Sequence, residues 1–382
     1  MENTLISIPI RLGRDRTLHI QQKPKSGITT AGGLLGALQS ITSSIASRSG
    51  AIHLQHVPAD APAVLDVLGA PGTSHDVQND ITDSAQTIVV HTAPAEPLQI
   101  YLRWPRDAVG LARLHLQTAD YPIRSAIEAP PPPLARELLV ETRSGSVAGP
   151  LPMEHLLDVS TSSGPVGITL LPLRLEKAAS SECKLSVKTS SGSVGVNAAV
   201  DPANAHAHLP GRDCAVALQT SSGSIRAVLG LTRSVSVRST SGSQNLTGVL
   251  RDMSRDRRSD FSSSTTSGSQ SIAVVAAADL DTTNPPAAEK AAPAEKKAAD
   301  TESGFVCKHA AGSGSVRVVY PPAWEGTVEA RSGSGSVAVT GGGVETDRPA
   351  RNRVTGVKGA RPLHHTDVST GSGSISVKFG EA

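Results

Sequence analysis

The stretch "TSSGSVGVN", Thr189 to Asn197, decides how the rest of the chain is interpreted. Close variants follow at "TSSGSIRAV", Thr220 to Val228, and at "TGSGSISVK", Thr370 to Lys378. Taken alone, the phrase could be a flexible Ser/Gly linker. A linker has no reason to recur with apolar residues at fixed positions around it, so the recurrence indicates a structural repeat.

One glycine aligns all copies of the repeat. Nine glycines hold that position: Gly145, Gly164, Gly192, Gly223, Gly242, Gly268, Gly314, Gly335 and Gly373. The closest copies are 19 residues apart, Gly145 to Gly164, and the widest 46, Gly268 to Gly314. The shortest spacings give a unit of about 20 residues, and the longer ones indicate that unit plus an insertion.

Apolar residues keep phase with this glycine. They recur seven and five places before it and two, four and six places after it, with Ser, Thr, Lys, Arg and Gly between them. Period-two alternation on both sides of a fixed glycine predicts a strand, a tight turn and a second strand. The inward-facing set is then expected to include Val187, Val194, Leu218 and Ile225, and the outward-facing set Lys188 and Arg226.

The residues of the turn agree with this interpretation. A hydroxyl residue usually stands three places before the glycine: Thr142, Thr161, Thr189, Thr220, Ser239 and Thr370. Short hydroxyl side chains bond neighbouring backbone groups at corners. The glycine itself would allow either a positive φ or a close approach between copies. Copies in register should therefore form a ladder of hydroxyl groups along one edge.

A 20-residue unit with two short strands cannot bury its own apolar face, whereas stacked copies can. We therefore predict an all-β fold, a parallel β-solenoid (β-helix) with disordered corner insertions. A sandwich or a jelly roll could use the same alternation, but corners locked in phase favour the solenoid. Aromatic residues make up only 2% of the chain, so the interior is expected to consist of Val, Ile, Leu and Ala.

The repeated S-G-S-[VI] phrase, with a leading Thr-Ser or Arg-Ser, resembles a known family. This is the "putative adhesin" domain family of β-solenoid proteins. The resemblance covers Leu138 to Phe379, with an outlying copy at "SRSGAIHLQ", Ser47 to Gln55. It implies the solenoid fold and an adhesive role, and it supplies no catalytic residues.

Two regions are expected along the chain. Residues 1–135 form a β-rich N-terminal region, either divergent copies or a cap, with strand-like segments "AVLDVLG", "TIVVHT", "PLQIYLRW" and "LARLHLQT". Residues 136–379 form the solenoid repeat domain after the proline-rich spacer "EAPPPPLARE". Within it, residues 276–303 are predicted to be a disordered insertion. Shorter insertions are expected at Arg251 to Asp260 and Gly341 to Pro362.

Bulk properties exclude several classes of partner. The formal net charge is +2, so no global field favours nucleic acid. The most apolar stretch, Ala31 to Ala46, is too short to span a membrane. No secretory signal is visible, which predicts a cytoplasmic protein, or a cell-surface one if the N-terminus is truncated.

The cysteines Cys183, Cys214 and Cys307 form no metal or disulfide pattern and are expected to be buried or inert thiols.

Candidate chemical motifs are weak. "GSGSVA", Gly333 to Ala338, resembles a dinucleotide motif but leads into a strand, whereas a dinucleotide site needs a helix. The histidine pairs His206 and His208, and His364 and His365, lack further ligands and are interpreted as solvated loop residues. "NLT" at Asn245 is a glycosylation acceptor only in a secreted chain. "RDRR" at Arg255 is interpreted as a salt-bridged loop.

A solenoid carbohydrate enzyme is the alternative, and it would need converging carboxylates beside aromatic platforms. Asp158 and Asp367 have no repeated acidic partner, and the rings Tyr101, Trp104, Tyr121 and Trp324 form no stripe. We therefore predict a non-enzymatic, adhesin-like binding or structural module that presents flat faces for protein–protein contact or self-association. No catalytic, cofactor-binding or metal-binding residues are predicted. Carbohydrate is an unsupported alternative ligand.

Overall fold

The computed structural model describes residues 4–24, 50–69, 76–92, 98–128, 134–172, 182–198, 213–250, 259–276, 304–360 and 363–380. Within these ranges the chain forms 29 β-strands and no helix. The chain divides into two compact units, Met1–Ala178 and Ala179–Ala382, and its strands belong to two large and mostly parallel sheets, A and B, which are described below by unit. The prediction of an all-β chain is therefore confirmed.

Unit 1 contains two sheets, which we call A1 and B1. In spatial order, A1 consists of β1 (Thr4–Pro9), β4 (Val64–Gly69), β7 (Gln99–Pro105), β3 (Ala51–Val57), β9 (Ile123–Ser125), β11 (Val147–Met153) and β13 (Val166–Pro172). B1 consists of β12 (Leu156–Thr161), β10 (Ala135–Thr142), β8 (Leu111–Thr118), β2 (Thr17–Pro24), β6 (Ala85–Thr92) and β5 (Asp76–Ile81).

Unit 2 also contains two sheets, A2 and B2. In spatial order, A2 consists of β15 (Val194–Ala198), β17 (Ile225–Gly230), β19 (Gln244–Leu250), β21 (Gln270–Ala276), β23 (Val316–Tyr320), β29 (Ile375–Phe379) and β25 (Val337–Gly341). B2 consists of β14 (Glu182–Thr189), β16 (Asp213–Thr220), β18 (Ser234–Ser239), β20 (Ser259–Ser267), β22 (Phe305–Ser313), β28 (His364–Ser372), β24 (Gly326–Ser332), β27 (Arg353–Lys358) and β26 (Val344–Ala350).

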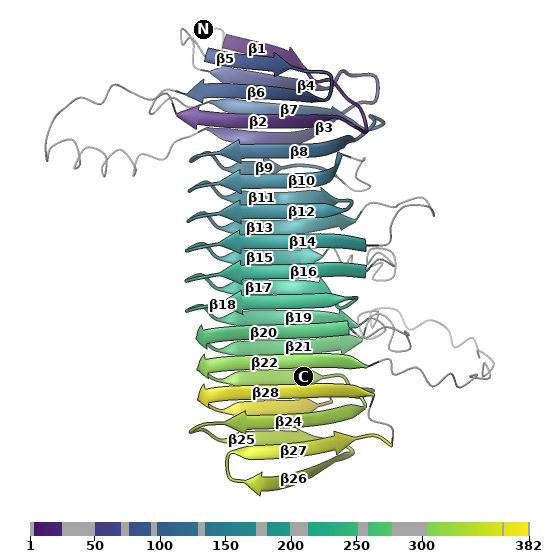
Figure 1. Ribbon diagram of the computed structural model, residues 1–382, viewed down its shortest axis with the longest axis vertical. Coiled ribbons are helices and arrows are strands. Elements are labelled where there is room, and N and C mark those ends of the chain that lie inside the picture. Colours follow the sequence, from purple (N-terminus) through teal and green to yellow (C-terminus); the bar gives the residue numbers. More distant parts are fainter. Residues whose placement is uncertain are drawn as a thin grey trace, which may run out of the picture. The chain divides into compact units, whose positions relative to one another are not determined.

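The predicted strand–turn–strand phrase is the building block of unit 2. One B2 strand, its glycine corner and the following A2 strand form what we call a repeat, and equivalent residues of neighbouring repeats lie side by side (Figure 1). Val187 thus pairs with Leu218, and Val194 with Ile225. All four are buried, whereas Lys188 and Arg226 are exposed. The predicted register is confirmed, because alternate side chains leave opposite faces of a strand.

The interior is largely aliphatic, as expected, but it is not free of rings. Leu, Val and Ile dominate the buried residues of both units. Seven of the eight aromatic residues are nevertheless buried: Trp104, Tyr121, Phe261, Phe305, Tyr320, Trp324 and Phe379. The expectation of a ring-free core was therefore wrong. Scarce rings fill the interior at particular places instead of forming an exposed stripe.

The N-terminal region contains the predicted strands. The four strand-like segments correspond to β4, β6, β7 and β8, and β3 lies in the outlying copy. Parallel pairs, such as β2 with β8 and β3 with β7, occur beside antiparallel ones, such as β1 with β4 and β5 with β6. β8 pairs in parallel with β10 on the far side of the proline-rich spacer. The boundary near residue 135 stays a prediction.

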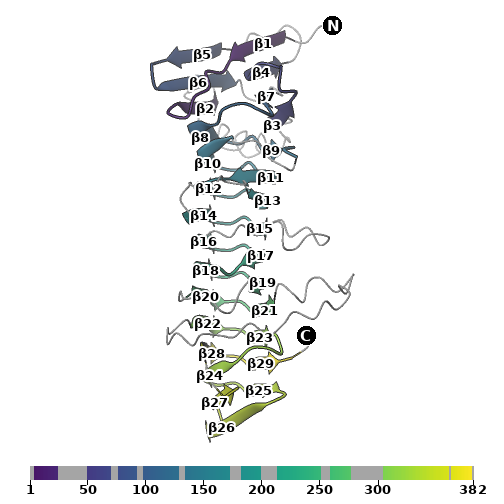
Figure 2. The same cartoon turned by 90° about the vertical axis from the view of Figure 1, so that its right-hand side faces the viewer.

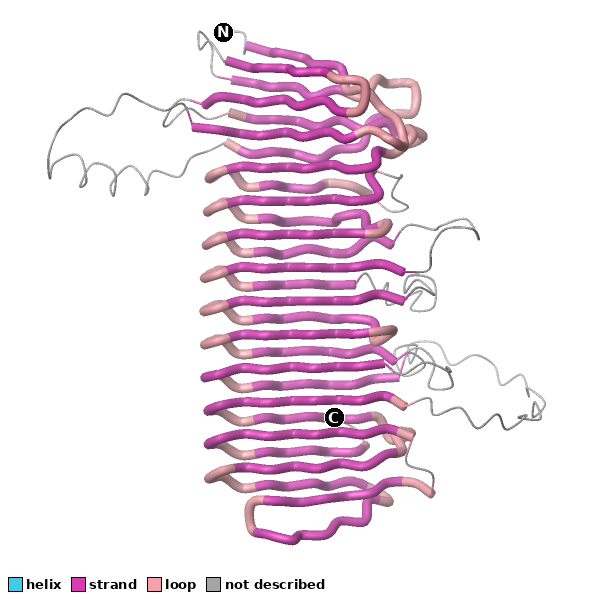
Figure 3. Tube along the Cα trace, in the orientation of Figure 1, coloured by secondary structure: helices cyan, strands magenta, loops and turns pink. Residues whose placement is uncertain are grey.

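The C-terminal repeat is out of sequence order. β28 lies between β22 and β24 in sheet B2 (Figure 1), and β29 lies between β23 and β25 in sheet A2 (Figure 2). Figure 3 shows the strands of the described residues in magenta, joined by loops in pink. The last repeat of the chain is therefore inserted between two repeats that precede it. Glycine spacing along the sequence carries no information about this order in space.

The insertion predicted at Gly341 to Pro362 is mostly a β-hairpin. β26 and β27 pair antiparallel, and β27 also pairs antiparallel with β24. The prediction of a mere corner insertion was wrong because Val354 is buried and gives the segment an apolar side to pack. β26, the edge strand of B2, bears Pro349 and several charges, which discourage further strand pairing. The predicted disordered insertion lies almost entirely outside the described residues.

Candidate binding surface

Most glycine corners are held by the hydroxyl residue three places before the glycine. At five corners the glycine N–H donates to that oxygen: Gly145 to Thr142 (2.9 Å), Gly164 to Thr161 (3.0 Å), Gly192 to Thr189 (3.0 Å), Gly223 to Thr220 (3.0 Å) and Gly335 to Ser332 (2.8 Å). At Gly268 and Gly314 the N–H donates to a backbone carbonyl of the neighbouring repeat instead. A buried backbone N–H thus finds its partner at a point where the sheet ladder stops. The same residue type recurs at these five corners because each has the same donor to satisfy.

These hydroxyl groups also connect neighbouring repeats. Thr220 Oγ1 donates to the Gly192 carbonyl at 3.1 Å, and Thr370 Oγ1 donates to the Gly314 carbonyl at 3.1 Å. Ser332 Oγ donates to the Gly373 carbonyl at 2.8 Å. The predicted hydroxyl ladder is therefore present, and it binds several of the repeats to their neighbours.

The glycines are required mainly by close approach. A Cβ atom on Gly223 would lie 1.9 Å from the Gly192 carbonyl oxygen, and one on Gly242 would lie 1.8 Å from that of Gly223. Neither glycine has a positive φ, whereas Gly314 (φ 132°) and Gly373 (φ 147°) combine both requirements. Any side chain at these corners would push neighbouring repeats apart.

Two rows of serine flank the corner glycines. The serine before the glycine donates to a backbone carbonyl of a neighbouring repeat, as Ser222 does to Ser190 (3.3 Å) and Ser241 to Ser221 (3.1 Å). The serine after the glycine is exposed in every repeat of unit 2: Ser193, Ser224, Ser243, Ser269, Ser315, Ser374 and Ser336. We call these seven residues the serine row. It borders the outer face of sheet A2.

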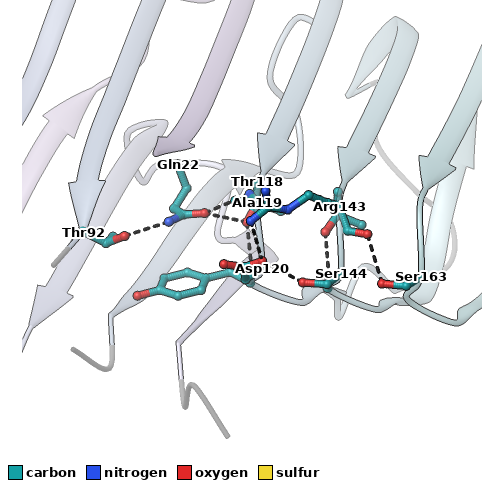
Figure 4. Close-up of polar contacts among 11 residues, drawn as sticks. Gln22, Thr92, Thr118, Ala119, Asp120, Arg143, Ser144 and Ser163 are labelled. Atoms are coloured by element: carbon teal, nitrogen blue, oxygen red, sulfur yellow. Dashed lines mark hydrogen bonds and ion pairs between the residues drawn. The ribbon is translucent and has the colours of Figure 1, made fainter. Parts of the chain in front are cut away.

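Figure 4 shows how the ladder begins in unit 1, where the corner after β8 has no glycine. Gln22 replaces a hydroxyl residue: its amide oxygen accepts from Thr118 Oγ1 (2.8 Å), and its amide nitrogen donates to Thr92 (2.7 Å). Asp120 then accepts from Ser144 Oγ at 2.7 Å and lies 3.5 Å from an Arg143 nitrogen. The sequence pattern missed this corner because Tyr121 stands where the other repeats have the aligning glycine.

The outer face of sheet B2 carries both signs of charge. Arg331 pairs with Asp367 at 3.2 Å, and Arg353 pairs with Glu329 at 2.8 Å. Across the first four strands runs a row of small residues, Ser186, Ala217, Ser236 and Ser262, beside a parallel row of Lys188, Gln219, Arg238 and Ser264. In the small row Ser186 is buried and the other three are half-buried. We call the second row the B2 row. The face is thus polar, with small side chains beside long cationic ones.

Unit 1 bears two stacked ring pairs on its outer faces. His19 and His115 stack with ring centroids 4.4 Å apart, and His115 lies 3.5 Å from Glu141. Burial, followed by the neighbouring His115, lowers the pKa of His19. On sheet A1, His53 stacks on Tyr101 at 4.7 Å. Each ring covers a face of its neighbour, so these pairs do not form flat platforms for a sugar.

A buried polar network lies inside unit 2. Ser263 Oγ is 2.8 Å from His309 Nδ1, the Tyr320 hydroxyl is 3.5 Å from His309 Nε2, and Thr366 donates to that hydroxyl at 3.1 Å. Burial lowers the pKa of His309 to about 3 and raises the pKa of Cys307 to about 12. Burial also raises the pKa of Tyr320 well above its usual value. The Ser–His pair resembles a nucleophile and its base, but a group sealed in the core cannot reach a substrate.

Cys183 and Cys214 form a disulfide, contrary to the prediction of inert thiols. They are register partners on β14 and β16, with Cα atoms 4.6 Å apart. Each stands nine places before its glycine, Gly192 or Gly223, and this shared phase was the overlooked signal. Cys307 is free and buried, as expected.

The remaining candidate residues from the sequence analysis do not come together in one site. His364 is buried on β28 and accepts from the Phe305 N–H at 3.2 Å, whereas His365 is exposed, so the prediction of two solvated loop residues was wrong. "GSGSVA" leads into strand β25, as predicted. Asp158 lies on β12 in unit 1 and Asp367 on β28 in unit 2, and Asn245 is exposed on β19. His206, His208 and Arg255 lie outside the described residues.

Two further features are absent from the described residues. Within those ranges no three His, Cys, Asp or Glu side chains are grouped so as to hold a metal ion. In the same part of the chain no helix offers a stretch long and apolar enough to cross a bilayer.

No protein-family model and no curated protein matches the chain. Among solved structures, a "putative lipid binding protein" from Parabacteroides distasonis is similar at 9% identity and a TM-score of 0.35, covering 98% of this chain and 96% of its own. A "putative adhesin" from Bacteroides fragilis is similar at 10% identity and a TM-score of 0.30, with coverage of 98% and 97%. A "putative cell adhesion protein" from Clostridium sporogenes reaches 7% identity and 0.21, with coverage of 99% and 100%. Similarity at this level establishes neither a family nor a function, so the resemblance to the adhesin family stays a prediction.

Proposed function

We propose that this chain is a parallel β-solenoid that acts as a non-enzymatic, adhesin-like binding module. The observation that carries the proposal is the repetition of exposed positions: the same corner and the same outward rows recur from repeat to repeat. Repetition provides a flat and extended face suited to contact with a partner. The acid–base groups with the largest pKa shifts are buried in the core and unavailable to a substrate.

The proposed contact is with a protein, on the outer face of B2. Small side chains in the row from Ser186 to Ser262 allow close approach, and Lys188 and Arg238 on the B2 row offer charges for orientation. Contact through the strand edge at the end of B2 is disfavoured by Pro349 in β26. A face-to-face contact therefore fits better than end-to-end assembly.

The Cys183–Cys214 disulfide supports an oxidising compartment for this function. Of the two expected locations, it favours the cell surface over the cytoplasm. Mass spectrometry after alkylation of the native protein in cell extracts tests this: both cysteines should be protected until a reductant is added. Free thiols at both positions would favour the cytoplasm instead.

The binding proposal is tested with the full chain as bait in a capture experiment read by mass spectrometry. A variant with Lys188→Glu and Arg238→Glu should lose the captured protein, whereas a variant with Arg226→Glu and Arg317→Glu should retain it. The two variants carry the same change in charge at exposed positions, but the second pair lies on A2. If both variants capture the protein as well as the unmodified chain does, or if the purified chain cleaves a polysaccharide, the proposal is contradicted.

A further inference from the structure

The outer face of sheet A2 differs in charge from that of B2. Its seven strands contain three basic residues, Arg226, Arg317 and Lys378, and no acidic residue. All three basic side chains are exposed, and within the described part of the chain none of them forms an ion pair. On B2, by contrast, carboxylates pair with several of the basic groups. A2 thus presents cationic groups whose charge is not neutralised by this sheet.

The cationic groups stand beside rows of neutral hydrogen-bonding groups. Arg226 and Arg317 belong to one outward row, which runs across the sheet as Gly195, Arg226, Asn245, Ser271, Arg317, Ser376 and Ala338. The serine row runs parallel to it at the glycine corner. Each hydroxyl group both donates and accepts, and two of the serines, Ser315 and Ser374, are 3.1 Å apart. Figure 2 shows the A2 strands lying one beside another, so these rows cross the sheet.

The spacing of charge on this face is wide. Arg226 lies on β17 and Arg317 on β23, three strands away, which corresponds to roughly 14 Å at about 4.8 Å per strand. Lys378 lies on β29, the strand beside β23, in register with Val319. A nucleic acid strand carries a phosphate about every 3.4 Å, and its binding sites commonly add aromatic side chains that stack on bases. The seven A2 strands supply neither that charge density nor an exposed ring.

We propose that the outer face of A2 binds an anionic polysaccharide, in which carboxylated sugars alternate with neutral ones. The carboxylates would pair with Arg226, Arg317 and Lys378, and guanidinium groups suit carboxylates because both are planar. The sugar hydroxyl groups would exchange hydrogen bonds with the serine row. The chain of sugars would lie across the strands, where the exposed groups repeat. This site is separate from the protein contact proposed on B2.

The test measures binding of fluorescein-labelled hyaluronan, whose carboxylate occurs on every second sugar, to the purified full-length chain by fluorescence anisotropy. The A2 variant carries Arg226→Gln, Arg317→Gln and Lys378→Gln, and the matched control carries Lys184→Gln, Lys308→Gln and Arg351→Gln. Both variants remove three exposed positive charges. The A2 variant should weaken binding by about tenfold or more, since each exposed ion pair contributes up to about fivefold. The control should bind as the unmodified chain does.

Three further arms separate the alternatives. Hyaluronan with its carboxyl groups reduced to alcohols should bind at least about fivefold more weakly if the ion pairs matter. Equal binding of the reduced polymer, or equal loss in both variants, would overturn the proposal. Preferential binding of single-stranded oligothymidine would show a nucleic acid site instead, and no binding to any polymer would also overturn it. Protein capture by B2 does not depend on these results, so the two proposals fail separately.

Discussion

Two regions of unit 2 use the same repeat with different interiors. In the repeats from Glu182 to Leu250, residues such as Leu185, Val187 and Leu218 fill the core. Between Phe305 and Phe379 the core instead contains Trp324, Tyr320, His309 and Cys307. Apart from the Cys183–Cys214 disulfide, the first region is held together by similar contacts made many times. The second is held by contacts that occur once, and this is where the chain departs from sequence order.

The unique contacts determine where the last repeat inserts. Thr366 on β28 donates to the Tyr320 hydroxyl, and His364 accepts from the Phe305 N–H. The Tyr320 ring stacks on Phe379 of β29 with centroids 5.4 Å apart. Val and Ile alone would suit almost any neighbour in such a sheet. Polar and aromatic partners in single copies therefore specify one order among several with similar apolar burial.

The largest effect is expected from removing the inserted repeat. Deletion of residues 364–382 removes one paired neighbour from each of β22, β23, β24 and β25 and exposes the aromatic cluster. We expect residues 305–358 to lose hydrogen-exchange protection while residues 182–250 keep it, with a fall in melting temperature of more than about 10 °C. A chain lacking only residues 381–382 is the control. Full protection of 305–358 after the deletion would mean that β22 pairs directly with β24.

A substitution at a glycine corner tests the regular region and is expected to have a smaller effect on stability. Gly223→Ala places a Cβ atom 1.9 Å from the Gly192 carbonyl oxygen, so the repeats must separate. We expect a loss of about 1–3 kcal/mol in the free energy of unfolding, measured by denaturant titration. Gly167→Ala is the matched control because nothing lies within 4 Å of its added Cβ atom. That substitution should be neutral or stabilise by up to about 1 kcal/mol. Equal responses would show that close approach does not matter at the corner.

The two regions should also differ in their response to acid. Burial holds the pKa of folded His309 at about 3, against 6.5 for the ordinary side chain, so below pH 6.5 the unfolded chain binds a proton that the folded chain does not. Stability is therefore complete above that pH and declines as the pH falls toward 3. Between about pH 8 and pH 4.5 this residue should account for a loss of roughly 2–3 kcal/mol.

Thermal unfolding across that pH range measures the loss. His309→Gln should flatten the pH dependence even if it lowers stability at neutral pH, because the substituted side chain does not titrate. Burial also lowers the pKa of His364, so some acid dependence should remain. His365→Gln, at an exposed position of β28, should leave the slope unchanged. An unchanged slope in His309→Gln would show that His309 does not couple folding to pH.

The sequence predicts the regular region well because repetition multiplies each signal. Alternation around Gly192 and Gly223 identifies the strands, their inward faces and the hydroxyl ladder, since every repeat reports the same constraint. The disulfide could also have been predicted. Equivalent positions in stacked repeats lie next to each other, and Cys183 and Cys214 occupy equivalent positions.

The irregular region could not be predicted in the same way. The order of β22, β28 and β24 depends on which surfaces pack best, and a periodic pattern does not encode it. His309 and Tyr320 fall on inward positions that every other repeat fills differently, so their network becomes visible only when the strands are brought together. The basic residues of A2 were likewise hidden, because Arg226 and Arg317 are far apart in sequence but belong to one row.

Two insertions interrupt the repeats, and the smallest effect is expected from replacing the first of them, residues 277–303. Residues 277–303 contain almost no large apolar side chain and include Pro285, Pro286 and Pro293, whereas residues 344–358 form a hairpin that buries Val354. Replacing 277–303 with a short Gly/Ser bridge should change the free energy of unfolding by less than about 1 kcal/mol, because loop-closure entropy varies slowly with length. The same bridge in place of 344–358 should cost about 2 kcal/mol or more, since it removes a buried side chain and the strand paired with β24. Circular dichroism and denaturant titration of both variants make the comparison. If the first replacement destabilises as much as the second, residues 277–303 belong to the packed structure, and the wide gap between Gly268 and Gly314 is not an insertion.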